Sequence, residues 1–339
     1  MSRGRFAAVA GVILTADFIG RDHSSREVSA MTKKKVVVAL GHTALGKTLP
    51  EQKEAAGKAA RAIADLVELG AEVAITHSNS QQVGMIHTAM NEFGKVHEHY
   101  TVAPMSICSA MSQGYIGYDL QSAIRTELLK RGIYKPVCTV LTQVLVDPYD
   151  DAFDEPTKVI GRTLTAEEAE AEEYKGNYVT KAERGYRRIV AAPTPHGIIE
   201  IDSIRALLEA GQIVIACGGG GIPVMQQDRG LKGASAIVEK DYVCGLMAEL
   251  LDADELLLLT GVDQLSAGYG TDREEKIGLI TTSEARRYMK EEQFDKKTVY
   301  PKLKASVDFV DQRPGRSAVI TSMEKAKEGY LEKAGTIIK

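Results

Sequence analysis

Several features that mark other classes of protein are missing from this chain. No run of about 18 apolar residues occurs in its 339 positions, so the sequence holds no segment that could span a membrane as a helix. Lysine and arginine (42) do not outnumber aspartate and glutamate (46), and the net charge of −4 argues against a general nucleic-acid binder. The chain has four cysteines: Cys108, Cys138, Cys217 and Cys244. They lie in apolar stretches without metal-ligand spacing, which predicts reduced core residues of a cytoplasmic protein.

The most distinctive stretch is a run of four glycines that follows a short apolar segment. Ile213–Cys217 predicts a buried strand, and it is followed by Gly218, Gly219, Gly220 and Gly221. Glycine tolerates positive φ angles and close approach of the backbone to a ligand, and successive N–H groups at such a turn can bind an anion. The run indicates a phosphate site beyond the carboxyl end of a strand, although a tight turn without a ligand explains it equally well.

Strand-like and helix-like segments alternate along most of the chain. Apolar runs such as Val36–Leu40 and Glu255–Thr260 predict strands, and amphipathic segments such as Pro50–Leu69 predict helices. This alternation predicts an α/β fold with a mainly parallel sheet flanked by helices. Pro136–Val146 is expected to form one long strand, and the acidic, turn-rich residues 147–188 a protruding subdomain or an active-site flap.

Residues 1–30 differ from the rest of the chain. Two arginines precede a short apolar stretch there, but no clean cleavage site follows it. We expect a disordered leader or an upstream extension, with a weak targeting segment as the alternative, and a folded domain that begins near residue 31.

Residues 41–48 match the phosphate-binding P-loop pattern G-x-x-x-x-G-K-[S/T] directly after a predicted strand. Pro50 stands where the helix of a P-loop should already be running, although proline is tolerated in a first turn. No later predicted strand ends in a convincing acidic residue, because the run up to Leu259 continues into Thr260 and Gly261. A P-loop that uses Lys47 and Thr48 is therefore a weaker alternative.

Three lysines stand where phosphoryl transfer could use them. Lys240 begins a predicted helix beside Asp241, Lys302 begins another, and Lys158 lies within residues 147–188. Phosphoryl transfer depends on positioned positive charge around the transferred group. We expect these lysines to converge, with Asp241 orienting two of them; for any single lysine the common alternative is a solvated surface charge.

Longer motifs resemble those of carbamate kinases. They are Leu141–Gly161, Ile198–Val224, Ser112–Tyr118, Gly230–Gly233, Val238–Asp241 and Ser283–Arg287. The resemblance covers nearly all of residues 33–339, and its motifs are more specific than the eight-residue P-loop match. It implies the amino-acid-kinase fold, a three-layer α/β/α sandwich with a mainly parallel central sheet and a small protruding subdomain. The implied single domain at 31–339 has a substrate lobe (31–197, with the subdomain at 147–188) and a nucleotide lobe (198–339).

The resemblance also implies an activity. In this family ATP and carbamate give carbamoyl phosphate and ADP, usually run in reverse to make ATP at the end of arginine or purine breakdown. ATP or ADP with Mg²⁺ would be the cofactor, with no metal ligands expected from the protein. The expected partners are small-molecule substrates and a second copy of the chain in a homodimer, without nucleic acid or membrane.

The family's functional positions fall on particular residues of this sequence. The implied catalytic residues are Lys240, Asp241, Lys302 and Lys158. The implied nucleotide- and phosphate-binding residues are Gly41, Gly218, Gly219, Gly220, Gly221 and Asp263. The implied substrate-binding residues are His42, Thr43, Asn79 and Gln113.

Several glycine-loop motifs depart from the family pattern. The first loop reads Gly-Gly-Asn in the family and Gly41-His42-Thr43 here, and the second reads Gly-Asn-Gly-Pro-Gln there and is Ser78–Gln82 here. A side chain in place of glycine puts atoms where backbone met phosphate or carbamate. The alternative function is therefore a carbamate-kinase-like paralogue with an altered substrate or weakened catalysis, which binds nucleotide or a carbamoyl compound.

Overall fold

The computed structural model describes residues 33–41, 45–46, 48–97, 99–100, 102–269, 272, 274–295 and 298–339. The expected leader at 1–30 lies outside the described residues, and so do His42, Thr43 and Lys47. In the described ranges, no helix combines the length and apolar character needed to cross a membrane.

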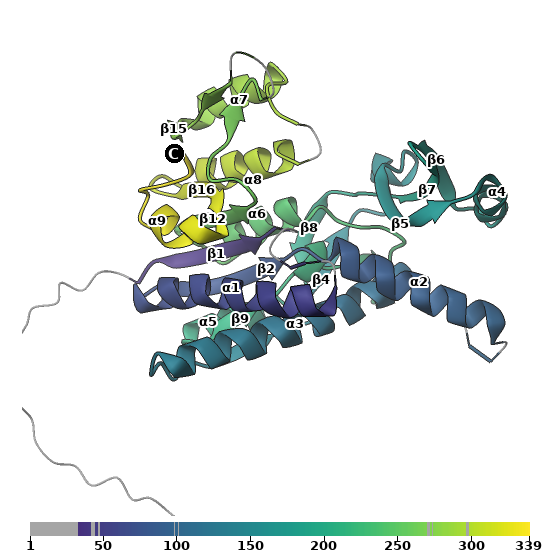
Figure 1. The fold of residues 1–339 in the computed structure, drawn as a ribbon, viewed down its shortest axis with the longest axis horizontal. Helices are drawn as coiled ribbons and strands as arrows, with labels where there is room; N and C mark the ends of the chain where they lie inside the picture. Colours follow the sequence, from purple (N-terminus) through teal and green to yellow (C-terminus); the bar gives the residue numbers. More distant parts are fainter. Residues whose placement is uncertain are drawn as a thin grey trace, which may run out of the picture. The chain divides into compact units, whose positions relative to one another are not determined.

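An eight-stranded sheet forms the centre of the fold, in the order β15-β17-β16-β12-β1-β2-β9-β3 (Figure 1). Its strands are β1 (Lys35–Leu40), β2 (Glu72–His77), β3 (Val137–Thr139), β9 (Ile213–Ile215), β12 (Glu255–Thr260), β15 (Leu279–Ile280), β16 (Ser317–Ser322) and β17 (Thr336–Ile338). Within this sheet only the pair β16–β17 is antiparallel. The predicted mainly parallel sheet is confirmed.

Helices cover both faces of this sheet. One face carries α1 (Leu49–Glu68), α3 (Met105–Lys130) and α9 (Ala326–Tyr330), and the other carries α5 (Ile201–Glu209), α6 (Lys240–Leu250), α7 (Thr282–Lys290) and α8 (Tyr300–Asp311). Successive residues of β1 alternate between two separate cores, with Val36 and Val38 in one and Val37 in the other. Burial of both faces explains the uninterrupted apolar runs in the sequence, and the three-layer α/β/α sandwich is confirmed.

Three smaller sheets complete the fold. One contains β4 (Gln143–Val146), β8 (Pro195–Ile198), β10 (Ile222–Gln227) and β11 (Gly230–Gly233), in the order β11-β10-β4-β8. Another contains β5 (Lys158–Leu164), β6 (Tyr178–Ala182) and β7 (Gly185–Val190), in the order β5-β7-β6. The last is the pair β13 (Ser266–Ala267) and β14 (Glu275–Lys276).

The prediction of one long strand over Pro136–Val146 is wrong. The residues form β3 in the central sheet and β4 in the sheet with β10. The chain leaves the central sheet near Thr142, whose hydroxyl donates to the carbonyl of Val140 (2.7 Å) and accepts from the backbone N–H of Cys217 (3.0 Å). Apolar periodicity cannot reveal this change of sheet, because both strands are rich in apolar and β-branched residues and only partly buried.

Residues 147–188 contain regular structure. They supply β5, β6, most of β7 and the helix α4 (Ala166–Tyr174), which begins with a capping box between Thr165 and Glu168. Helix α2 (Ser80–Val96) runs from the end of β2 toward this sheet and contacts β5 (Figure 1). A cleft between α2 and β5 is thereby bounded by two elements that are far apart in the sequence.

The segment that matches the P-loop pattern begins helix α1 in a different way. Thr48 is the N-cap of α1: its hydroxyl accepts from the N–H of Glu51 (3.4 Å), and the Glu51 carboxylate accepts from the N–H of Thr48 (3.1 Å). Pro50 fits in the first turn because its missing N–H has no partner to lose there. Thr48 therefore has a structural role that needs no nucleotide.

Glu255, the first residue of β12, is a fully buried carboxylate. It pairs with Lys34, but within the described part of the chain its Oε1 has no hydrogen-bond partner. Burial raises the pKa of this carboxyl group from 4.5 to about 7, against the opposing effect of Lys34. The folded protein therefore retains this proton over a range in which the unfolded chain has lost it.

Stability should fall as the pH rises through this window. A carboxyl group whose pKa is raised in the folded state contributes its full stabilisation below pH 4.5. This contribution to the free energy of unfolding, on the order of 3 kcal/mol, is lost as the pH rises past 7. Urea unfolding at pH 5 and pH 8 should give a smaller pH difference for Glu255→Gln than for the wild type. Glu54→Gln, at an exposed position of α1, should behave like the wild type. Equal pH differences in all three proteins would contradict this prediction.

Candidate active site

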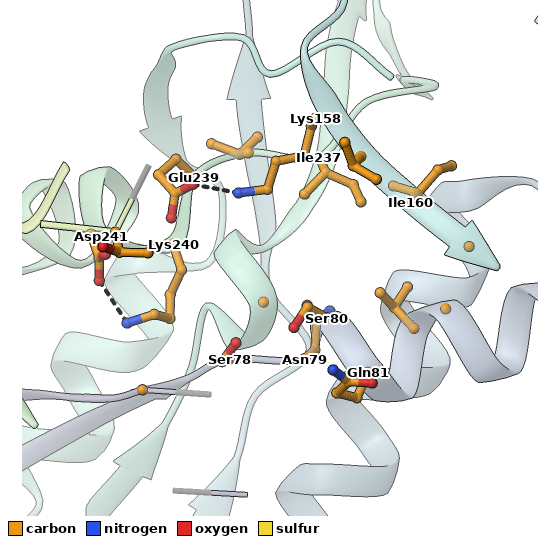
Figure 2. Close-up of a pocket in the computed structure, with 18 of the residues that line it drawn as sticks. Ser78, Asn79, Ser80, Gln81, Lys158, Ile160, Ile237, Glu239, Lys240 and Asp241 are labelled. Carbon is orange, nitrogen blue, oxygen red and sulfur yellow. Dashed lines mark hydrogen bonds and ion pairs between the residues drawn. The ribbon is translucent and has the colours of Figure 1, made fainter. Parts of the chain in front are cut away.

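A pocket of about 1010 Å³ lies at the carboxyl ends of the central strands (Figure 2). Residues that follow three parallel strands line it: Gly41 after β1, Ser78–Gln81 after β2, and Gly261 and Val262 after β12. The starts of α6 and α8, the strand β5 and part of α2 also contribute to the wall. This is the edge of an open α/β sheet at which ligands bind.

Asp241 joins two lysines from separate helices. Its Oδ1 lies 2.7 Å from the Nζ of Lys240, and its Oδ2 lies 2.8 Å from the Nζ of Lys302. The side chains of Asp241, Lys240 and Lys302 are 3%, 11% and 19% exposed. Lys302 also donates to the carbonyl of Thr298 (2.9 Å). Two ammonium groups are thus fixed at the pocket wall by one carboxylate.

The charges of this group stabilise one another. Burial alone would raise the pKa of Asp241, but Lys240 and Lys302 outweigh it and lower the pKa to about 2. Burial alone would lower the pKa of Lys240, but the carboxylate of Asp241 outweighs it and leaves the pKa raised. Asp241 and Lys240 therefore stay charged near neutral pH.

Lys158 reaches the same pocket from β5. Its Nζ lies 2.5 Å from Oε2 of Glu239, the N-cap residue of α6. Figure 2 shows this pair above the Lys240–Asp241 pair, with Ser78–Gln81 in the lower part of the view. The three predicted lysines therefore line one pocket.

The glycine run makes a sharp turn packed closely on all sides. Cys217, Gly219, Gly220 and Gly221 all have positive φ angles between 54° and 89°. A Cβ atom on Gly219 would overlap the side chain of Asn79, and one on Gly220 would overlap the carbonyl of Val238. The run therefore lets the end of β9 approach α2 and the start of α6.

A buried network holds this turn from behind. Gln113 donates to the carbonyls of Gly218 (3.0 Å) and Thr142 (3.2 Å) and accepts from the N–H of Thr142 (2.8 Å). His77 is also buried, and its Nδ1 lies 2.9 Å from the carbonyl oxygen of Ser78. Burial lowers the pKa of His77 to about 4, so the imidazole is neutral where it packs against Gly218.

Asn79 lies between the glycine run and α2. Its side chain is buried, donates to the hydroxyl of Ser112 (2.8 Å) and also borders the pocket. Ser78, Ser80 and Gln81 line the pocket beside it. The departures from the family's second loop therefore place side chains inside the cavity.

The site residues predicted from the sequence occupy different positions relative to the pocket. Those that line the pocket are Gly41, Asn79, Lys158, Gly219, Lys240, Asp241 and Lys302. Those that pack behind its wall are Gly218, Gly220, Gly221 and Gln113. Asp263 is exposed, and its carbonyl accepts from the hydroxyl of Thr321 (3.1 Å). His42 and Thr43 lie outside the described residues.

Several residues that line the pocket were not predicted from the sequence. Glu239 was missed although it directly precedes Lys240, and His87 and Thr88 were missed on α2. His87 and Thr88 follow Ser80 by seven and eight residues along the helix. This spacing predicts that they share one face of α2 with Ser80. Arg187 on β7 carried no local signal of this kind.

The described residues include no group of three or more His, Cys, Asp or Glu side chains placed to hold a metal ion. Both oxygens of Asp241 are taken by lysines, and Glu239 is paired with Lys158. The carboxylates of this pocket therefore serve to position lysines.

The comparisons with known proteins agree with this geometry. Residues 34–322 match the Amino acid kinase family, and the chain belongs to that family.

Individual relatives show which members of the family this chain resembles. The chain is 48% identical over 307 residues to the carbamate kinase-like protein YqeA of Escherichia coli, covering 90% of this chain and 99% of that protein. It is 41% identical to the carbamate kinase of Staphylococcus haemolyticus, with the same coverage. Among solved structures, carbamate kinase from Giardia lamblia bound to AMP-PNP superposes with a TM-score of 0.86 at 32% identity, covering 91% of this chain and 98% of that one.

Gly219 and Gly211 provide a test of the packing of the glycine run. Both have positive φ angles (69° and 78°), but a Cβ on Gly211 would meet open space. We expect Gly211→Ala to cost about 1–2 kcal/mol through backbone strain alone, and Gly219→Ala to cost about 1–3 kcal/mol more through overlap with Asn79. Urea unfolding measures both. An equal loss in the two variants would mean that the contact with Asn79 is unimportant.

Proposed function

We propose that this protein is a carbamate kinase, which transfers a phosphoryl group reversibly between ATP and carbamate. The observation that carries the proposal is the convergence of Lys158, Lys240 and Lys302 on one pocket, with Asp241 bridging two of them. Relatives named carbamate kinase match over about nine-tenths of the chain and support it.

Phosphoryl transfer between ATP and carbamate requires little from the protein beyond positive charge and correct positioning of the substrates. Carbamate and the β-phosphate of ADP are both anionic nucleophiles, so neither direction needs a general base. Asp241 fits this requirement, because its pKa of about 2 makes it a poor base and both its oxygens are engaged. We assign it the orientation of Lys240 and Lys302, whose ammonium groups offset the charge on the transferred phosphoryl group.

Lys158 completes the set from the opposite wall. Its side chain is 37% exposed, and its ammonium group pairs with Glu239 at the pocket edge, so it can reach a phosphate oxygen by a change of rotamer. We propose that residues 147–188 act as the subdomain that delivers it. In this scheme residues 31–197 carry the acceptor and residues 198–339 carry the nucleotide.

We propose ATP and ADP as the nucleotides, in line with the AMP-PNP bound to the Giardia relative. We propose that Gly41 and Gly219 border the phosphates and that Asp263 contacts the nucleotide. Because the pocket carboxylates are occupied by lysines, Mg²⁺ would enter on the nucleotide phosphates and keep much of its water shell. The fold supplies no protein-built site for it among the described residues.

Formation of ATP from carbamoyl phosphate and ADP tests the function directly. The wild type should be active, and Lys240→Ala should lower kcat by about 10²–10³ because a fixed charge near the transferred group is lost. Lys232→Ala, on the exposed strand β11, is the matched control and should retain full activity. Activity of Lys240→Ala within a few-fold of the wild type would refute the assignment of Lys240.

The second candidate is a paralogue with a different substrate or weak catalysis. Ser78 and Ser80 favour it, since their side chains occupy the pocket where the family has glycines. Nucleotide binding by calorimetry, without ATP formation from carbamoyl phosphate, would identify this function.

In either case we place the protein in the cytoplasm, with its four cysteines free. For the kinase, we place the reaction in arginine or purine breakdown.

We also propose a homodimer. Helix α3 exposes an apolar stripe at helical spacing, formed by Ile107, Met111 and Tyr118. Such a stripe is suited to an interface between two copies of the chain. Sedimentation should give twice the mass of one chain, and Met111→Glu should shift it toward the monomer. Glu170→Gln, at an exposed position on α4, should leave the mass unchanged. A monomeric wild type would exclude the proposal.

A further inference from the structure

A small apolar core joins helix α2 to the β5-β7-β6 sheet and is separate from the two cores of the central sheet. Its members come from α2, from the residues that lead into and begin α3, and from β5 and β7. The buried ones are Val83, Ala103, Met105, Cys108, Ile160 and Val190. We call this cluster the α2–β5 core. It connects elements that are far apart in the sequence, and it lies beside the pocket, which several of its members line.

Strand β5 presents Lys158 and Ile160 on the same face. Side chains two residues apart on a strand share a face, and Lys158 pairs with Val190 of β7 in the antiparallel ladder. Residues directly opposite each other in such a ladder also share a face. Because Ile160 and Val190 belong to the α2–β5 core, Lys158 lies on the face of the sheet that packs on α2. The core therefore fixes the face of β5 that carries Lys158.

The α2–β5 core also reaches the wall that carries Lys240. Ile237, three residues before Lys240, packs against the core, and its N–H donates to the carbonyl of Ala191 directly after β7 (3.0 Å). Figure 2 shows Lys158, Ile160 and Ile237 in the same part of the pocket wall. One set of apolar contacts thus holds both the strand that carries Lys158 and the segment that leads into Lys240.

Electrostatics alone do not hold Lys158 in this position. The ammonium groups of Lys158 and Lys240 line one pocket, and like charges repel each other. The attraction of Lys158 to Glu239 is that of a partly exposed ion pair, and such pairs contribute little to stability. Burial of a branched apolar side chain contributes more. The α2–β5 core is therefore the larger contribution to the placement of Lys158.

Building on the proposed function, we propose that Ile160 and Ile237 are positioning residues. Through the α2–β5 core they hold Lys158 where its ammonium group reaches the transferred phosphoryl group together with that of Lys240. Displacement of a reacting group by about 1 Å can lower a rate by about 100-fold. A shortened side chain at either position should therefore impair catalysis, and the central sheet should remain folded because its own cores are separate.

A double-mutant cycle on ATP formation from carbamoyl phosphate and ADP tests this role. We expect Lys158→Ala to lower kcat by about 100-fold and Ile160→Ala to lower it by about 10-fold, with KM within a few-fold of the wild type. In the Lys158→Ala background, Ile160→Ala should cause no further loss, because the group that it positions is gone. Ile160→Val keeps the branch at Cβ and should recover most of the activity.

Ile189→Ala is the matched control. Ile189 precedes Val190 on β7, so its side chain lies on the opposite face of the sheet, away from the α2–β5 core. The substitution removes the same atoms from the same small sheet, and kcat should stay within about 2-fold of the wild type. Ile237→Ala should behave like Ile160→Ala, including the absence of a further loss without Lys158. Thermal unfolding checks that each variant is folded.

A distance measurement separates this inference from the proposed function, because it requires no turnover. Spin labels at Glu183, in the turn between β6 and β7, and at Lys58 on α1 occupy exposed positions. Ile160→Ala should broaden the distribution of distances between them, and Ile189→Ala should leave it as in the wild type. Absence of ATP formation from carbamoyl phosphate would refute the kinase, and the distance distribution would still test the α2–β5 core.

Each of these measurements has an outcome that overturns the inference. Equal losses from Ile160→Ala with and without Lys158 would exclude positioning through Lys158 and indicate direct contact with the substrate. An unchanged distance distribution in Ile160→Ala would exclude a role of the α2–β5 core in holding the small sheet. Full activity of Lys158→Ala beside an active wild type would refute the role of Lys158, and this inference with it, but not the kinase.

Discussion

The rest of the site depends on the buried carboxylate of Asp241. Two ammonium groups lie within 3 Å of this one carboxylate at a largely buried position, where each partner offsets the desolvation of the others. Without that carboxylate, Lys240 and Lys302 would repel each other, and the buried one would tend to lose its proton. The pocket wall therefore holds two lysine ammonium groups in place through one carboxylate.

This charge cluster requires α6, α8 and the glycine run to meet closely. Lys240 and Asp241 begin α6, and Lys302 lies in the first turn of α8. The turn at Gly218–Gly221 packs against the residues just before α6, and it has no room there for a Cβ atom. The glycines thus contribute mainly by permitting close approach of elements, and only Gly219 among them borders the pocket itself.

The opposite wall is less constrained. Lys158 and Arg187 lie on a separate small sheet, joined to the rest of the site by the Lys158–Glu239 pair and by contacts with α2. A partly exposed ion pair is weak compared with packing in a core. The end of the pocket that holds Lys240 and Lys302 is therefore built on buried elements, whereas the end that holds Lys158 is built where residues can change without disturbing the central sheet. Ser78 and Ser80 line the same pocket.

The sequence by itself determined the layered α/β fold, because strands buried on both faces, such as β1 and β12, must be continuously apolar. It also singled out Lys158, Lys240, Lys302 and Asp241, which the fold brings to one pocket. Only the tertiary structure decided that Pro136–Val146 divides between two sheets and that Gln113 braces the glycine turn. It also decided that Arg187 and His87 share a cavity with Lys240. The physical reason is that these relations join segments distant along the chain, and local periodicity carries no information about which distant surfaces pack together.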